Sequence, residues 1–203
     1  MKADVKTLHD LTSTDVRYLV PRYQRPYVWT EEKHWEPLWS DIESAFERLE
    51  NGETRDHFLG AIVLQEGDTP PGEPTRYQVI DGQQRLTTTQ ILIGAGANVA
   101  FEAGVDKVGR RLSRMVLNDE DAAEGDERFK LWPTAQDRHA FRLVMSPGGP
   151  PVDAEDDPNN TIQEAYDYFY RPDAAFAVGD GSDPEAAAHR LAARSRQANR
   201  HRR

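Results

Sequence analysis

The chain has 203 residues, of which 37% are hydrophobic and 30% charged, and its formal net charge is −10. It contains no cysteine, which excludes disulfides, thiolate zinc sites and cysteine nucleophiles. This length suits one domain with a sizeable core, and the negative charge argues against wrapping nucleic acid with the whole surface, because that requires clustered Lys and Arg.

The first half of the chain predicts strands, an extended loop and one helix. Residues 16–29 mix β-branched and aromatic residues with two prolines, which predicts a short strand that runs into an extended loop. After Pro37, which suits a first helical turn, apolar residues recur at helical spacing until an Asn-Gly pair ends the pattern. Residues 58–64 predict a short buried strand and residues 76–80 a second one.

The second half alternates predicted helices with one strand. Residues 87–103 predict a helix, and 128–133 predict a strand. Thr134 is expected to cap a helix that continues to residue 145. After a Pro-, Gly- and Asp-rich loop, a capping box of Thr161 and Glu164 predicts a helix through residue 170.

The composition changes after residue 171. Ala, Gly and Asp dominate, a further helix is predicted from Pro184, and residues 189–203 contain six arginines and no acid. We therefore predict a domain over 1–171 and a linker with a basic tail over 172–203. No apolar stretch approaches the ~20 residues of a membrane helix, and the N-terminus lacks a signal-peptide pattern, so we expect a cytoplasmic protein with no membrane partner.

The segment DGQQR lies where the predicted strand 76–80 passes into the following helix. A strand, a glycine turn and a helix start bring unpaired backbone N–H groups and the positive end of a helix dipole to one point, which suits an anion. Arg85 can add a fork of donors for phosphate oxygens, and Gln83 and Gln84 can bind ribose, base or water. Asp81 can hold Mg²⁺ or orient a nucleophilic water.

These properties fit a nucleoside triphosphate site, but they do not require one. A D-G turn ahead of a helix is also an ordinary structural feature, and the segment matches neither a Walker A loop nor a Rossmann fingerprint. The nucleotide and the structural interpretation both stay open.

A second candidate site precedes the first predicted helix. Its extended segment alternates side chains between two faces and combines aromatic rings with one cation; the residues are Tyr23, Gln24, Arg25, Pro26, Tyr27 and Trp29. Such a surface suits a partly desolvated phosphate, and sulfur in place of an oxygen would be tolerated because it is polarizable and weakly hydrated. In the alternative, Tyr27 and Trp29 belong to the core and only Arg25 is exposed.

Two further features carry weaker signals. His57 can be a base or a phosphate contact, although a single histidine at a strand edge is more often structural. The arginines of GRRLSR, residues 109–114, can contact a DNA backbone or can form an ordinary solvated helix face.

Three ordered motifs carry a family resemblance: VPRYQRPYVW, HFLGAIVLQ and VIDGQQRLTTTQIL. They closely resemble the N-terminal domain of the GmrSD family of modification-dependent restriction enzymes, including the SspE-type proteins that act on phosphorothioate DNA. Weaker likeness in KLWPTAQDRHAF and TIQEAYDYF extends the resemblance over residues 15–171. It implies an α+β fold similar to the ParB/sulfiredoxin-like fold, with a small mixed sheet surrounded by helices.

The resemblance also implies a function. The DGQQR element is associated with hydrolysis of a nucleoside triphosphate, often GTP, with Mg²⁺ as the expected ion. Carried over, Asp81, Gln83, Gln84 and Arg85 are the catalytic residues, and Gly82, Thr87 and Thr88 bind the nucleotide. The segment 23–29 then serves either the nucleotide or modified DNA.

The expected partner in the full protein is a C-terminal HNH-type nuclease domain, whose His and Asn core this chain does not contain. We therefore expect a sensor domain with NTPase activity. A non-catalytic binding module and a ParB-like regulator are the alternatives, and the acidic charge disfavours the second.

Overall fold

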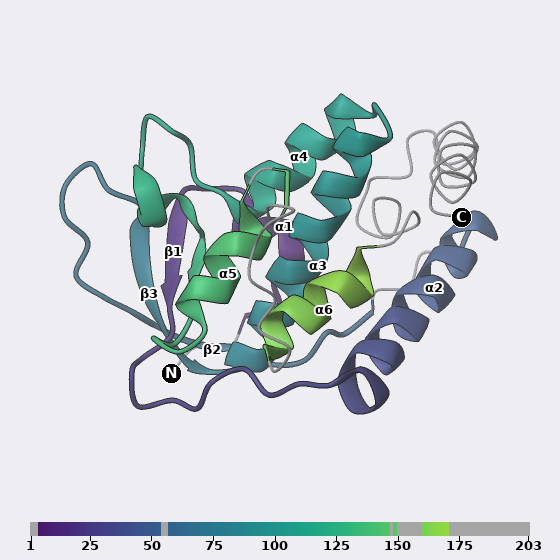
Figure 1. The fold of residues 1–203 in the computed structure, drawn as a ribbon, viewed down its shortest axis with the longest axis horizontal. Coiled ribbons are helices and arrows are strands. Elements are labelled where there is room, and N and C mark those ends of the chain that lie inside the picture. Colours follow the sequence, from purple (N-terminus) through teal and green to yellow (C-terminus); the bar gives the residue numbers. More distant parts are fainter. Residues whose placement is uncertain (1–3, 54–56, 147, 150–159, 171–203) are drawn as a thin grey trace.

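The computed structural model describes residues 4–53, 57–146, 148–149 and 160–170 (Figure 1). A four-stranded mixed sheet has the order β2-β3-β1-β4, and β1 runs parallel to both β3 and β4, whereas β2 is antiparallel to β3. The strands are β1 (Val16–Leu19), β2 (Val63–Glu66), β3 (Thr75–Asp81) and β4 (Leu131–Trp132). This confirms the predicted α+β class with a small mixed sheet; the likeness to ParB and sulfiredoxin stays a prediction.

Six α-helices accompany the sheet in the described residues. They are α1 (Leu8–Thr12), α2 (Glu36–Glu50), α3 (Gln83–Glu102), α4 (Asp106–Val116), α5 (Arg138–Met145) and α6 (Thr161–Phe169). A π-helical turn, Glu31–Trp35, leads directly into α2, and a 3-10 turn covers Gly125–Arg128. Across these described ranges, none of the helices is long and apolar enough to cross a bilayer.

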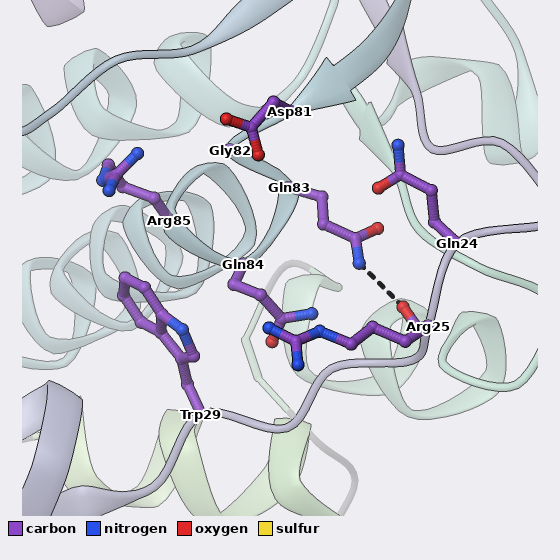
Figure 2. Close-up of a pocket in the computed structure, with 8 residues that line it drawn as sticks. All are labelled: Gln24, Arg25, Trp29, Asp81, Gly82, Gln83, Gln84 and Arg85. Atoms are coloured by element: carbon purple, nitrogen blue, oxygen red, sulfur yellow. Dashed lines mark hydrogen bonds between the residues drawn. The ribbon is translucent and has the colours of Figure 1, made fainter.

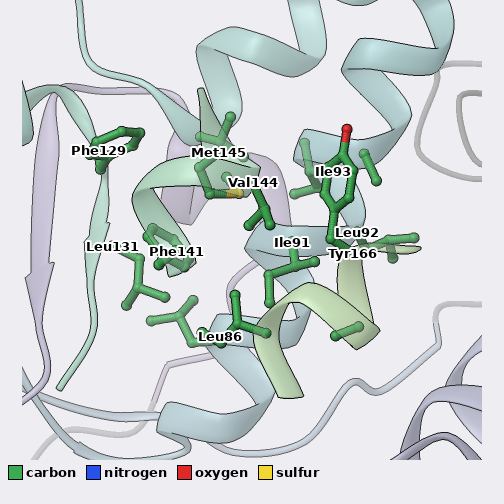
Figure 3. Close-up of a cluster of buried hydrophobic side chains, with 14 of the residues drawn as sticks. Leu86, Ile91, Leu92, Ile93, Phe129, Leu131, Phe141, Val144, Met145 and Tyr166 are labelled. Atoms are coloured by element: carbon green, nitrogen blue, oxygen red, sulfur yellow. The ribbon is translucent and has the colours of Figure 1, made fainter. Parts of the chain in front are cut away.

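Helix α3 forms the centre of the fold, with α4, α5 and α6 packed around it (Figures 1 and 3). Nearly all of its residues from Gln83 to Ala100 are buried, as expected for a helix enclosed on every side. Gly94 allows a close approach to α5, since a Cβ there would lie 2.9 Å from the Met145 sulfur. The buried start of α3 therefore carries the DGQQR segment into the core.

The parallel pairing of β1 and β3 positions the two candidate motifs. Leu19 lies opposite Gln78, so both strands end at the same edge of the sheet. The loop that follows β1 and the turn that follows β3 consequently emerge side by side. Residues separated by more than fifty positions in sequence meet at this edge.

Several predicted boundaries are wrong for local physical reasons. The strand predicted over 58–64 begins only at Val63, because Gly60 has a positive φ of 108° and the register shifts at the start of β2. The helix predicted from Thr87 begins at Gln83, so the two glutamines and the arginine form its first turn. The predicted strand 128–133 shortens to the two residues of β4.

Two predicted caps are also wrong. Asp137 precedes α5 as its N-cap residue, and Thr134 instead donates its hydroxyl to the Asp137 carboxylate at 2.6 Å. Asn160 caps α6 by accepting from the Ile162 N–H, which leaves the Thr161 hydroxyl free for another contact. Helix α1 was not predicted, and the predicted tail at 172–203 and its helix lie outside the described residues.

Candidate functional site

A pocket of about 380 Å³ lies at the shared edge of β1 and β3 (Figure 2). The loop after β1 and the segment after β3 line it; the residues are Gln24, Arg25, Trp29, Asp81, Gly82, Gln83, Gln84 and Arg85. The two motifs interpreted as neighbouring nucleotide and DNA sites thus face one pocket. Tyr23 and Pro26 are not among its lining residues, and Tyr23 is 78% exposed.

Gly82 makes the sharp passage from β3 into α3. Its φ of 88° lies in the left-handed region, and a Cβ there would come within 3.0 Å of the Ala61 carbonyl oxygen. As the N-cap residue, glycine offers no side-chain acceptor to the first turn of α3. The positive end of the helix therefore forms part of the pocket wall.

The two glutamines bind the loop that follows β1. Gln84 donates from Nε2 to the Pro26 carbonyl at 2.9 Å and accepts at Oε1 from the Val28 N–H at 2.8 Å. Gln83 donates from Nε2 to the Arg25 carbonyl at 2.8 Å. Both polar atoms of Gln84 are thus engaged by the loop, which is a positioning role, whereas Oε1 of Gln83 keeps its acceptor capacity.

The same loop is fixed from further sides through Tyr27, which is 4% exposed. Its N–H donates to Asp137 Oδ2 at 3.0 Å, and its carbonyl accepts from the Thr161 hydroxyl at 3.1 Å. Its hydroxyl accepts from Trp35 Nε1 at 2.8 Å and lies 2.6 Å from the Thr88 hydroxyl. Burial raises the pKa of Tyr27 well above its usual value, so the hydroxyl stays neutral.

These contacts correct two parts of the sequence interpretation. Tyr27 belongs to the core, as the alternative interpretation held, and it does not contribute a ring to an aromatic surface. Thr88 is fully buried and donates to the Gln84 carbonyl, and Thr87 is 3% exposed, so both threonines point into the protein rather than toward a nucleotide. The reason is the earlier start of α3, which turns them to the core side.

Charged groups of both signs line the pocket. Arg85 is half-buried; its Nη1 donates to the Ala61 carbonyl at 2.6 Å, and its guanidinium lies so close to Gly60 that a Cβ there would be 2.5 Å from Cζ. The side chains of Arg25 and Asp81 are exposed, and within the described residues neither makes a hydrogen bond or an ion pair. An anion with a bound cation can therefore engage both without displacing a partner from the described part of the chain.

The pocket lining offers Mg²⁺ one carboxylate, which suits the chemistry of the ion. No group of three acidic or histidine side chains that could hold a metal occurs in the described parts of the chain. Mg²⁺ is commonly held by one or two carboxylates together with substrate phosphates and waters, and Asp81 can supply one such carboxylate. The phosphates of a bound nucleotide would supply the other ligands from outside the protein.

Trp29 forms the aromatic side of the pocket. Its indole stacks on the His34 ring, with centroids 4.8 Å apart and planes inclined by 11°. His34 is itself held by its Nδ1, which accepts from the Thr30 N–H at 3.1 Å. On the other side of the pocket, Gln24 donates to the carbonyls of Val79 at 2.8 Å and Ile80 at 3.0 Å, which joins the loop to the end of β3.

Sequence reasoning missed the residues that support the loop from a distance. Asp137 and Thr161 lie more than one hundred positions from Tyr27, and no local pattern indicates that they bind it. His57, considered as a base, is paired with Asp41 at 3.6 Å and does not line the pocket. The arginines of 109–114 belong to α4 and also lie outside the lining.

Comparison with known proteins identifies the family. The family model described as "GmrSD restriction endonuclease, N-terminal domain" matches residues 6–187, a span that includes every residue of the pocket. A search of curated proteins found no match. Because the matched span covers nearly the whole chain, the protein belongs to the family of GmrSD restriction endonuclease N-terminal domains.

Proposed function

We propose that this domain binds a nucleoside triphosphate in the pocket and hydrolyses it when modified DNA is present. The observation that carries the proposal is one pocket lined by Arg25, Arg85, the positive end of α3 and the Asp81 carboxylate, which has no partner among the described residues. Two cations and a helix start attract phosphates, and the carboxylate suits the accompanying ion. The family resemblance favours GTP and phosphorothioate DNA over other nucleotides and modifications.

The residues of the chain have distinct tasks in this proposal. Arg25 and Arg85 hold phosphate oxygens, with Arg85 exchanging its bond to the Ala61 carbonyl for one to the ligand. Asp81 would hold Mg²⁺, which would supply positive charge beside the phosphates, or Asp81 would orient the attacking water. Gln84 keeps the loop in place so that Arg25 stays beside the pocket. In the full protein, turnover would license a C-terminal HNH-type nuclease.

The test is phosphate release by the purified chain. GTP and ATP are each incubated with Mg²⁺ alone, with plain duplex and with phosphorothioate duplex of the same sequence. We expect release that phosphorothioate DNA stimulates, and that Asp81→Asn reduces more than it reduces nucleotide binding. Absence of release under every condition, despite measurable nucleotide binding, would contradict hydrolysis.

A non-catalytic binding module is the second candidate, and a specific observation favours it. The side chains of Gln84 and Arg85 already form hydrogen bonds with the backbones of Pro26, Val28 and Ala61, as residues of a structural turn would. In that case DNA or nucleotide would bind without turnover. The same assay separates the two candidates, because a binding module retains the ligand and releases no phosphate.

A further inference from the structure

We propose that the stacked pair Trp29 and His34 is a platform for a nucleobase, and that the base rather than the phosphates determines which ligand the pocket accepts. This inference deepens the proposed function, since it assigns the base subsite of the same pocket. The ligand chemistry is a nucleobase attached to a phosphate, and it can come from a free nucleotide or from a base of DNA.

The geometry of the pair supports a stacking role. The rings are nearly parallel, with centroids 4.8 Å apart, so His34 covers one face of the indole. The Thr30 N–H bond to His34 Nδ1 fixes the orientation of that ring before any ligand arrives. Trp29 packs in part against the core and also lines the pocket, so a part of the indole faces the pocket, where a planar group can contact it.

Trp29 differs from the other tryptophans of the chain. The structure describes all four, and Trp35, Trp39 and Trp132 have exposed fractions of 2%, 5% and 8%, whereas Trp29 is only partly buried. A large aromatic ring kept accessible at the side of a polar pocket is suited to a ligand that is itself flat.

The charges around Trp29 match the rest of such a ligand. Figure 2 shows the indole on the same side of the pocket as the Arg85 guanidinium, with the Arg25 side chain beside Gln84. A base on the indole thus leaves its phosphate near cations, and the exposed Asp81 carboxylate can accept from base or ribose donors or hold an ion. An isolated phosphate would use the cations but would gain nothing from the ring.

Fluorescence and equilibrium dialysis test the platform together. The emission of wild type is titrated with GTP, ATP, inorganic triphosphate and short single-stranded DNA, and dialysis measures affinity without relying on tryptophan. The variants are Trp29→Phe, Trp29→Leu and His34→Ala, with His9→Ala on the exposed face of α1 as the matched histidine control. Thermal unfolding checks that each variant is folded.

We expect nucleotides to quench the emission of wild type and inorganic triphosphate to leave it nearly unchanged. Trp29→Leu should weaken nucleotide binding about 5- to 150-fold, the range for loss of one base–aromatic stack. Trp29→Phe should retain most of the affinity but lose the quenching, because the three remaining tryptophans are buried. His34→Ala should weaken binding and His9→Ala should not.

The other outcomes separate this inference from the proposed function. Equal nucleotide affinity in wild type, Trp29→Leu and His34→Ala would overturn the platform and leave nucleotide binding intact. If no nucleotide binds but single-stranded DNA quenches Trp29, the platform holds for DNA bases and the proposed nucleotide function fails. If neither ligand alters the emission of wild type, the platform is wrong. If Trp29→Leu does not fold, the wild-type titrations and the nucleotide affinity of His34→Ala still test the platform.

Discussion

The two segments beside the pocket, residues 24–29 and 57–62, are held in different ways. The first segment is bound by side chains of α3, α6, the π-helical turn and Asp137, which precedes α5, and its Tyr27 is buried. The second segment is held chiefly through Arg85 on the Ala61 carbonyl, and its Phe58 and Leu59 side chains are exposed. One wall is therefore preorganised, whereas the other depends on a residue that a ligand would also recruit.

The largest effect should come from breaking the preorganised wall. Gln84→Leu leaves the Pro26 carbonyl and the Val28 N–H without their partner, so we expect the free energy of unfolding to fall by about 2–6 kcal/mol, at roughly 1–3 kcal/mol per unpaired group. Urea denaturation measures it. Gln78→Leu on the exposed side of β3 is the control and should change stability by less than about 0.5 kcal/mol. Equal losses in both variants would show that the loop does not depend on Gln84.

Arg85→Ala should affect the other wall and the ligand together. Nucleotide binding should weaken by about 1.5–3 kcal/mol, the range for a charged hydrogen bond, while the free energy of unfolding should fall by only about 1 kcal/mol through loss of the Ala61 contact. Calorimetric titration and urea denaturation give the two values. A variant that unfolds while wild type binds no nucleotide would identify the segment as purely structural.

Gly82→Ala tests how closely the turn packs against the second segment, residues 57–62. The left-handed φ costs about 1–2 kcal/mol for any residue with a Cβ, and here the Cβ also meets the Ala61 carbonyl oxygen at 3.0 Å. Gly72→Ala is the matched control, because Gly72 has a similar φ of 85° but nothing within 4 Å of its Cβ. Gly82→Ala should lower the free energy of unfolding more than Gly72→Ala does. Equal losses would mean that residues 61–62 can move away from the new Cβ at no cost.

The smallest effect concerns Asp137 and the pH dependence of stability. Burial raises the pKa of Asp137 in the folded protein, although hydrogen bonds from Thr134 and Tyr27 partly oppose this. The folded state therefore binds the proton more tightly, so this group makes the protein less stable as the pH rises from the unfolded pKa, about 3.9, through the raised folded pKa. Asp137→Asn keeps an oxygen acceptor for both bonds and should remove this decline. Denaturation of wild type and Asp137→Asn between pH 4 and 7 measures how the stability of each depends on pH. Parallel curves would contradict a raised pKa of Asp137.

Sequence reasoning identified most of the pocket because its residues lie in two short motifs. Asp81 to Arg85 and Gln24, Arg25 and Trp29 were all named, and the parallel strands bring them together. It also predicted the central strand β3 and helix α2 from local apolar spacing. Such patterns involve only a few neighbouring residues, so the sequence alone indicates them.

What could not be predicted depends on contacts between distant segments. The start of α3 was placed four residues late because glutamine and arginine do not resemble the first turn of a buried helix. Gln83 and Gln84 are buried at this position because the loop backbone provides hydrogen-bond partners for both; Pro26 lies 58 positions from Gln84. The inward orientation of Thr87 and Thr88 follows from that shift, and Asp137 binds Tyr27 across 110 positions.

The enclosure of α3 limits how its first turn can move. Its first turn holds the pocket loop, and its middle turns are buried against α4, α5 and α6, with close approaches where Gly94 meets Met145 and where Gly109 of α4 meets Phe101. A close-packed interior has little free volume in which to absorb a displacement. We therefore expect a displacement of the first turn to be shared along the helix rather than absorbed locally.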